Sequence, residues 1–174
     1  MNMFSIILEN LRGYDLLIFF LALFNFLYIL PRVKQTALAL EQRLQPTIYA
    51  PIESILRMIR EPGTEKGFDL HLLRDLRDRQ NHFFHLHLTI NSLFPLLGIL
   101  GTVIALLRLT DLDDAVILLN FTRALTSTFW GLIFAILFKS IDGFIFAKVD
   151  ENEADFNLLI NRIDMKTKGE YDEA

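Results

Sequence analysis

The chain has 174 residues, of which 52% are hydrophobic, and its mean hydropathy of +0.36 is too high for an ordinary soluble domain of this length. The formal net charge of -4 gives no support for nucleic-acid binding, and the lack of cysteine excludes thiol catalysis and a disulfide scaffold. The apolar residues are collected in blocks with the charges between them, which is typical of a chain that crosses a bilayer several times.

The first apolar block, residues 16–30, reads "LLIFFLALFNFLYIL" and is shorter than the roughly 20 residues that a spanning helix needs. It can span if Tyr14 and Asp15 lie at the membrane interface, and Pro31 is expected to close it. A cleavable signal peptide is the alternative, but no basic segment precedes the block and no small-residue cleavage site follows it. The sequence therefore favours a retained membrane anchor.

The segment between the first two apolar blocks, residues 32–85, has apolar residues at helical spacing. Pro46 and Pro51 should interrupt the first helix there, and "EPG" at 61–63 should end it. A second helix is expected to run from about residue 68 into the next span. Its charged run at 74–79 either engages a partner or forms a solvated, salt-bridged face, and the second interpretation is favoured.

Two further blocks complete the membrane part. Residues 86–109 carry no charge before Arg108 and are long enough to span. Residues 115–138 are followed by Lys139, Asp142 and more apolar residues up to Ala147, so one long helix that protrudes on one side is expected. The class predicted is an all-α membrane protein with three transmembrane helices and cytoplasmic helical extensions.

The orientation follows from the lysines and arginines, because cytoplasmic segments retain positive charge. Nine of the seventeen lie between the first and second spans. The N-terminus is therefore expected outside and the C-terminus in the cytoplasm. The predicted regions are 1–31 (outside N-terminus and first span), 32–85 (cytoplasmic helical segment), 86–147 (second and third spans) and 148–174 (cytoplasmic tail).

His82, His85 and His87 lie within six residues and raise the question of a metal site. Residue 87 is off the helix face that the other two share, and neither a cysteine nor a well-placed carboxylate completes a ligand set. An interfacial cluster without metal is the preferred interpretation, and a pH-sensing role stays open. Because no phosphate-binding loop, nucleophile elbow or pair of catalytic carboxylates is present, neither an enzyme nor a cofactor is expected.

The second and third spans each carry a stripe of small, weakly polar residues at spacings of three and four. The second span contributes Pro95, Gly98, Gly101, Thr102 and Ala105, and the third contributes Ala124, Ser127, Thr128, Gly131 and Ala135. These stripes either form the seam between the two helices or line a hydrated ion path. Neither stripe holds an ionisable group, so a proton-carrying carboxylate would have to come from another chain.

The sequence of these stripes resembles the paired signature of the MotA/TolQ/ExbB proton channel family, over roughly residues 90–147. The first half, P-x-x-G-x-x-G-T, is filled by Pro95, Gly98, Gly101 and Thr102. The second half, A-L-x-x-T-x-x-G-L, is filled by Ala124, Leu125, Thr128, Gly131 and Leu132. Three spans with a cytoplasmic segment after the first are similar to the TolQ and ExbB branch.

The resemblance implies a homopentamer in the bacterial inner membrane. Its second and third spans would surround a single-span partner dimer, of the ExbD, TolR or MotB type, that carries a membrane aspartate. Thr102 and Thr128 match the two threonines that face the ion path in the family. Arg123 stands where ExbB and TolQ proteins typically have glutamate, and it either contacts an acidic partner or extends to the outer interface.

Two functions of different class follow from these observations. The first is a stator-type subunit of an ion-motive-force-driven motor, which uses proton flow to do mechanical work. The second is a passive membrane scaffold whose stripes only pack helices. The hydroxyls would serve protons or sodium ions equally, and the sequence does not name the load that such a motor would drive.

Overall fold

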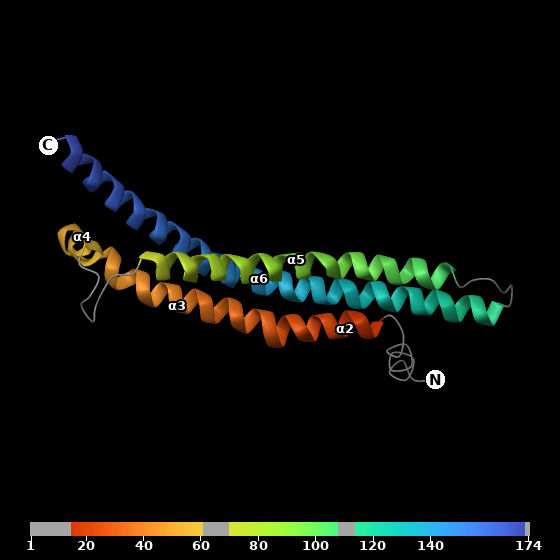
Figure 1. The fold of residues 1–174 in the computed structure, drawn as a ribbon. Coiled ribbons are helices and arrows are strands. Elements are labelled where there is room, and N and C mark those ends of the chain that lie inside the picture. The colour runs from red at the N-terminus through yellow and green to blue at the C-terminus, as the bar shows by residue number, and fades with distance from the viewer. Residues whose placement is uncertain (1–14, 61–69, 108–113, 173–174) are drawn as a thin grey trace. The chain divides into compact units, whose positions relative to one another are not determined.

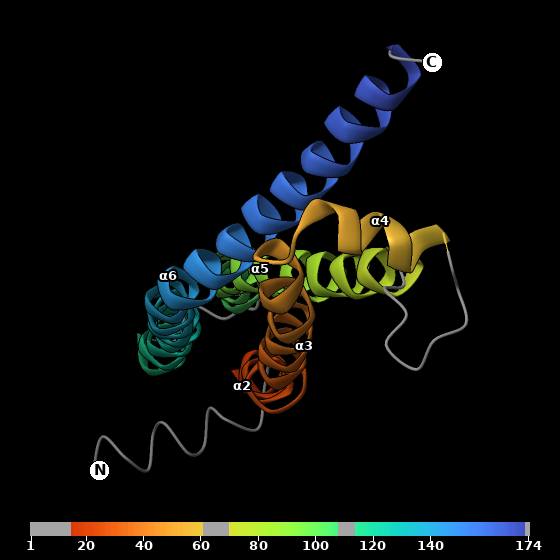
Figure 2. The same ribbon diagram turned by 90° about the vertical axis from the view of Figure 1, so that its left-hand side faces the viewer.

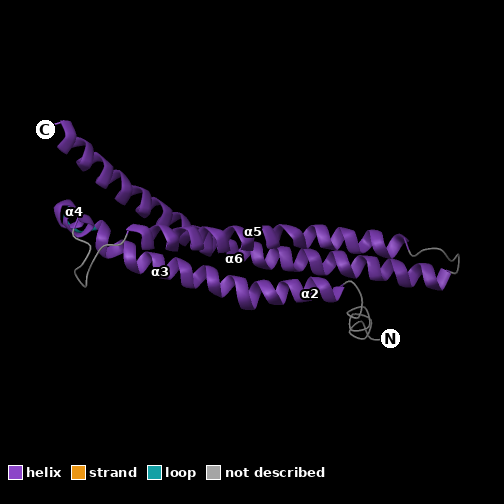
Figure 3. Cartoon of the chain, viewed as in Figure 1, coloured by secondary structure: helices purple, strands orange, loops and turns teal. Residues whose placement is uncertain are grey.

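The computed structural model describes residues 15–60, 70–107 and 114–172, and within these ranges the chain is helical without any strand (Figures 1 and 3). The elements in order are α2 (Asp15–Phe24), the π-helical turn η1 (Asn25–Ile29), α3 (Leu30–Ile48), α4 (Ile52–Arg60), α5 (Leu70–Leu107) and α6 (Asp114–Asp172). This agrees with the all-α class expected from the sequence.

The expectation that Pro31 ends the first helix is wrong, because the helical path continues from Asp15 through Pro31 to Ile48. Proline has no N–H to donate, and its ring clashes with the carbonyl one turn earlier in a regular α-helix. Here the preceding turn is the π-helical η1, in which the Leu30 N–H bonds the carbonyl of Asn25. This wider turn lies where the proline ring would otherwise meet the backbone.

The expected interruption at Pro46 is also wrong, since Pro46 lies inside α3. The break comes three residues later, and α4 begins after Pro51, whose carbonyl accepts the Ser54 N–H at 3.0 Å. The chain bends between α3 and α4 (Figure 2). The "EPG" stop signal at 61–63 lies outside the described residues, and α4 ends just before it at Arg60.

The prediction of an unbroken helix that enters the second span is confirmed by α5, and the prediction of one long third helix by α6. Two described stretches, Asp15–Ile48 and Leu70–Leu107, are long and apolar enough to cross a membrane. Only 33% and 28% of their most apolar windows are buried. Exposed apolar surface on this scale suits contact with lipid. The third span, at 115–138, stays a prediction, as does the orientation.

The chain divides into two compact units, each built from segments far apart in the sequence. Unit 1 comprises residues 1–31 and 85–143, and unit 2 comprises residues 32–84 and 144–174. The described parts of unit 1 are α2, η1, the C-terminal part of α5 and the N-terminal part of α6. Unit 2 contains most of α3, all of α4, the start of α5 and the end of α6.

Unit 1 is a three-helix bundle in which neighbours in sequence are antiparallel. The α5–α6 contacts run from Gly98 with Thr128 to Asn91 with Asp142, so residue numbers rise in opposite directions. Aromatic rings hold the bundle together: Phe19 of α2 packs edge-on against Trp130 of α6, with ring centroids 4.8 Å apart. Stacking of Phe94 on Phe138 at 5.3 Å joins α5 to α6.

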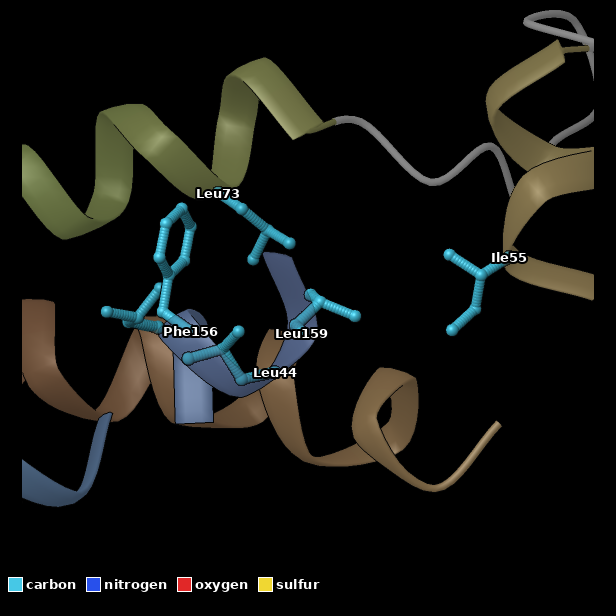
Figure 4. Packing of buried hydrophobic residues seen from close by; sticks show 6 residues of the cluster. Leu44, Ile55, Leu73, Phe156 and Leu159 are labelled. Carbon is cyan, nitrogen blue, oxygen red and sulfur yellow. The ribbon is translucent and has the colours of Figure 1, made fainter. Parts of the chain in front are cut away.

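Unit 2 has a hydrophobic core that draws on all four of its helical segments (Figure 4). Its buried members are Leu40, Leu44, Ile55, Leu73, Phe156 and Leu159. Around this core, Arg162 of α6 donates to the carbonyls of Ile48 and Ala50, which satisfies acceptors that the end of α3 leaves open. Asn152, only 1% exposed, bonds the carbonyl of Ala37 at 2.9 Å.

Three charged residues of the run at 74–79 form ion pairs within unit 2. Arg79 forms an i,i+4 ion pair with Asp75 at 3.0 Å, while Arg77 binds the Glu153 carboxylate through two guanidinium nitrogens. The Arg77 guanidinium also lies 4.7 Å from the centroid of the Phe156 ring. These contacts are of the kind that the salt-bridged interpretation predicts.

The Arg77–Glu153 pair makes unit 2 sensitive to acid. The hydrogen bond from Arg77 holds the pKa of Glu153 below its ordinary value of 4.5. The pair therefore stabilises the fold above about pH 4.5, and this contribution is lost as the pH falls through the lowered folded-state value. Because both side chains are close to 30% exposed, the contribution is about 1 kcal/mol or less.

We expect Glu153→Gln to flatten this acid dependence. The measurement is the free energy of unfolding of the full chain at neutral pH and at about pH 3. The parent chain should lose more stability between the two conditions than the variant does. An equal loss in both chains would show that the ion pair has no part in the acid response.

Candidate functional site

The two halves of the glycine–threonine signature meet at the contact between α5 and α6. Thr128 donates its hydroxyl proton to the carbonyl of Gly98 at 3.1 Å. A Cβ added to Gly98 would lie 3.1 Å from the Cα of Thr128, and one added to Gly131 would lie 2.6 Å from the carbonyl oxygen of Phe94. The backbones thus approach so closely that glycine is required at position 131.

The stripe residues differ in their exposure. Buried members are Gly98, Gly101, Ala124, Ser127 and Gly131, whereas Pro95, Thr102, Ala105, Thr128 and Ala135 are half-buried. The two threonines also differ in their partners, since the Thr102 hydroxyl bonds the carbonyl of Ile99 on its own helix at 2.5 Å. Of these two threonines, Thr128 is the one whose hydroxyl bonds across the α5–α6 contact. The side chain of Arg123 lies outside what the structure describes.

Ser127 binds an ionisable group that sequence reasoning placed elsewhere. Its hydroxyl donates to Asp15 of α2, and the two side chains are each only 4% exposed. The sequence suggested a membrane-interface position for Asp15 and found no acid on either stripe. Because Asp15 is 112 positions away in the chain, no spacing rule could join it to Ser127. The stripe on α6 therefore has a carboxylate of its own chain beside it.

A second set of buried polar residues was not predicted from the sequence. Asn25 of η1, His87 and Asn91 of α5, and Asp142 of α6 contact one another, and none is more than 8% exposed. Asn25 Nδ2 donates to Asn91 Oδ1 at 2.7 Å, and Asn91 Nδ2 donates to Asp142 Oδ1 at 2.8 Å. His87 joins the set through both ring nitrogens, at 2.9 Å from Asn25 Oδ1 and 3.0 Å from Asp142 Oδ1. We call these four residues the polar cluster.

The polar cluster corrects the interpretation of the histidines as one interfacial group. His82 and His85 are exposed, whereas His87 is fully buried. The sequence had already placed residue 87 off the helix face that His82 and His85 share. The face that carries His87 is buried in unit 1, which explains the difference. In the described residues no group of three or more histidine or acidic side chains is arranged to hold a metal ion.

Lys139 and Asp142 form an ion pair within α6, with Lys139 Nζ 3.8 Å from Asp142 Oδ2. Its acidic member is also part of the polar cluster, so the pair is more than a link along one helix. A groove of about 650 Å³ opens beside it on unit 1. The groove is lined by Leu88, Asn91, Ser92, Pro95, Ala135, Ile136, Lys139, Ser140 and Asp142.

Comparison with known proteins adds one positive finding. The family model for the MotA/TolQ/ExbB proton channel family matches residues 42–157, which is two thirds of the chain and includes both halves of the signature. No curated protein and no solved structure matches the chain. The family is one of channel proteins, in agreement with the non-enzymatic role expected from the sequence. The chain belongs to the MotA/TolQ/ExbB proton channel family.

Proposed function

We propose that this chain is the stator-type subunit of a proton-motive-force-driven motor in the bacterial inner membrane. It forms a homopentamer with three spans per chain, the N-terminus outside and the C-terminus in the cytoplasm. The second and third spans surround a single-span partner dimer that carries a membrane aspartate. Proton flow past that aspartate is coupled to mechanical work, with Thr102 and Thr128 on the ion path.

The observation that carries this proposal is the position of Thr128 in a chain of this family. Its hydroxyl lies at the contact between the two signature halves and bonds Gly98, which is itself buried. A hydroxyl can donate to and accept from water or an ion as well as a carbonyl. Half-buried Thr128 therefore combines access with a fixed position, which are the two properties that an ion-path residue needs.

A passive scaffold is the alternative, and the close backbone contacts at Gly98 and Gly131 favour it as much as they favour a channel. Buried ionisable groups, however, serve an ion path more directly than they serve helix packing. Asp15, His87 and Asp142 are buried among helices whose outward surface is largely apolar. Such groups are costly within a membrane protein and usually mark ion or substrate pathways. They favour the motor subunit.

The test is Thr128→Val in the complex purified with its native partner and reconstituted in liposomes. Valine keeps the shape of threonine and removes the hydroxyl, while the Gly98 carbonyl keeps the backbone hydrogen bond that its position inside α5 provides. We expect the complex to assemble and its potential-driven proton uptake, read with a pH-sensitive dye, to fall roughly tenfold or more. Thr102→Val should also lower proton uptake.

The matched control is Thr122→Val on the same helix, because the Thr122 hydroxyl bonds the carbonyl of Leu118 one turn earlier. It should assemble and conduct like the parent chain. Full proton uptake by both Thr128→Val and Thr102→Val would remove the ion-path role. A parent complex without proton uptake and without a co-purifying single-span protein would favour the scaffold.

A further inference from the structure

The polar cluster is not part of the signature motif and its hydrogen bonds fix one another. An ionised Asp142 can only accept, so the Asn91 amide turns its nitrogen toward Asp142 and its oxygen toward Asn25. Asn25 then donates to that oxygen and leaves its own oxygen facing His87 Nδ1 at 2.9 Å. Since this oxygen only accepts, Nδ1 of His87 must carry a proton.

The second ring nitrogen then sets a condition. A neutral imidazole with its proton on Nδ1 has a lone pair on Nε2, and Nε2 lies 3.0 Å from Asp142 Oδ1. Two lone pairs at this distance repel each other. One additional proton between His87 and Asp142, held either by the imidazole or by the carboxyl group, removes this repulsion.

The hydrogen bonds of the cluster also allow that proton to be released. Asn91 Nδ2 lies 3.2 Å from His87 Nε2, and its second N–H can occupy the Nε2 lone pair once the proton has left. The other oxygen of Asp142 faces Lys139, whose ammonium group can pair with the carboxylate. Asp142, Asn91 and Lys139 all line the groove on unit 1, which connects the cluster to its outside.

We propose that His87 and Asp142 form a proton-binding site of this chain, which loads and releases one proton through the groove between α5 and α6. Among the described residues, the charged groups in contact with the pair are Asp142 itself and Lys139, both on α6. The elements η1 and α5 contribute only the uncharged amides of Asn25 and Asn91. The assignment of this proton to the ion flow of the motor rests on the proposed function, whereas the site itself does not.

The direct test is nitrogen NMR of the full chain labelled with ¹⁵N-histidine, with the signals of His87 identified by their loss in His87→Gln. We expect Nδ1 of His87 to stay protonated at every pH. Its Nε2 signal should move with pH as the shared proton leaves. In Asp142→Asn the Nε2 signal should stay fixed, because the introduced amide donates to Nε2 and removes the negative charge that retains the proton.

The matched control is His85→Gln, two residues away on an exposed position, which should leave the His87 signals unchanged. A His87 ring that is protonated on Nε2 and bare on Nδ1 would overturn the site, and this result needs only the parent chain. The same titration of Nε2 with and without the Asp142 carboxylate would overturn it as well.

Proton uptake by the reconstituted complex separates this inference from the proposed function. If Asp142→Asn lowers uptake and Thr128→Val also does, both stand. If the His87 titration is found but neither threonine variant affects uptake, the proton site stands and the proposed ion path fails. If Asp142→Asn takes up protons normally while Thr128→Val does not, this site has no role in the ion flow.

Discussion

Gly131→Ala is expected to lower the free energy of unfolding of the full chain by about 1 to 3 kcal/mol, a large effect for one methyl group. The added Cβ would lie 2.6 Å from the carbonyl oxygen of Phe94 and 3.0 Å from the Cα of Gly98. Both neighbours are backbone atoms of α5, which cannot rotate away as a side chain would. The helices must therefore separate, and the Thr128–Gly98 hydrogen bond should lengthen with them.

Gly143→Ala is the matched control, because nothing lies within 4 Å of a Cβ added there. Gly143 is on the same helix, and alanine favours helix by about 1 kcal/mol relative to glycine. We therefore expect Gly143→Ala to be neutral or stabilising. The measurement is unfolding in detergent followed by circular dichroism. Equal stabilities for the two variants would show that α5 and α6 are not in backbone contact at Gly131.

The second large effect is expected in unit 2, where Leu159→Ala should cost about 2 to 5 kcal/mol of unfolding free energy. Leu159 is fully buried in the core cluster of α3, α4, α5 and α6 (Figure 4). Truncation removes its apolar contacts and leaves a cavity among side chains that close only partly around it. Since four helical segments share this cluster, the loss should loosen all of them together.

Leu158→Ala makes the same chemical change on the next residue, which is 48% exposed. We expect its effect to stay within about 0.5 kcal/mol. Chemical unfolding of both variants, monitored by helix content, gives the comparison. A loss at position 159 no larger than the loss at position 158 would mean that the unit 2 core does not form as described.

Helix content and helix length were readable from the sequence because they depend on local patterns. The charge-free stretch of the second span and the apolar spacing before it predict α5 as one helix, and the structure agrees. The predictions that Pro31 and Pro46 would end or interrupt a helix were wrong. Their ordinary effect on a helix was applied, but the π-helical turn before Pro31 depends on backbone geometry that no spacing rule contains.

The candidate site divides in the same way. The small-residue stripes were predictable, because a close helix contact demands glycine at positions with a fixed spacing, and Gly98 and Gly131 do lie at such a contact. The polar cluster was not predictable, because Asn25, His87 and Asp142 come from three helices and each looks ordinary on its own helix. A faint signal existed in asparagine and histidine within apolar blocks, where they require partners.

The division of unit 2 into two distant segments has a consequence for biosynthesis. Leu44 leaves the ribosome well before Phe156 and Leu159, which pack against it in the same cluster. All of unit 1 after Pro31 is made in between. At about 5 to 20 residues per second, the apolar face of α3 waits roughly ten seconds for its cover. During this interval the apolar face of α3 lacks the α6 side chains that bury it in the finished fold.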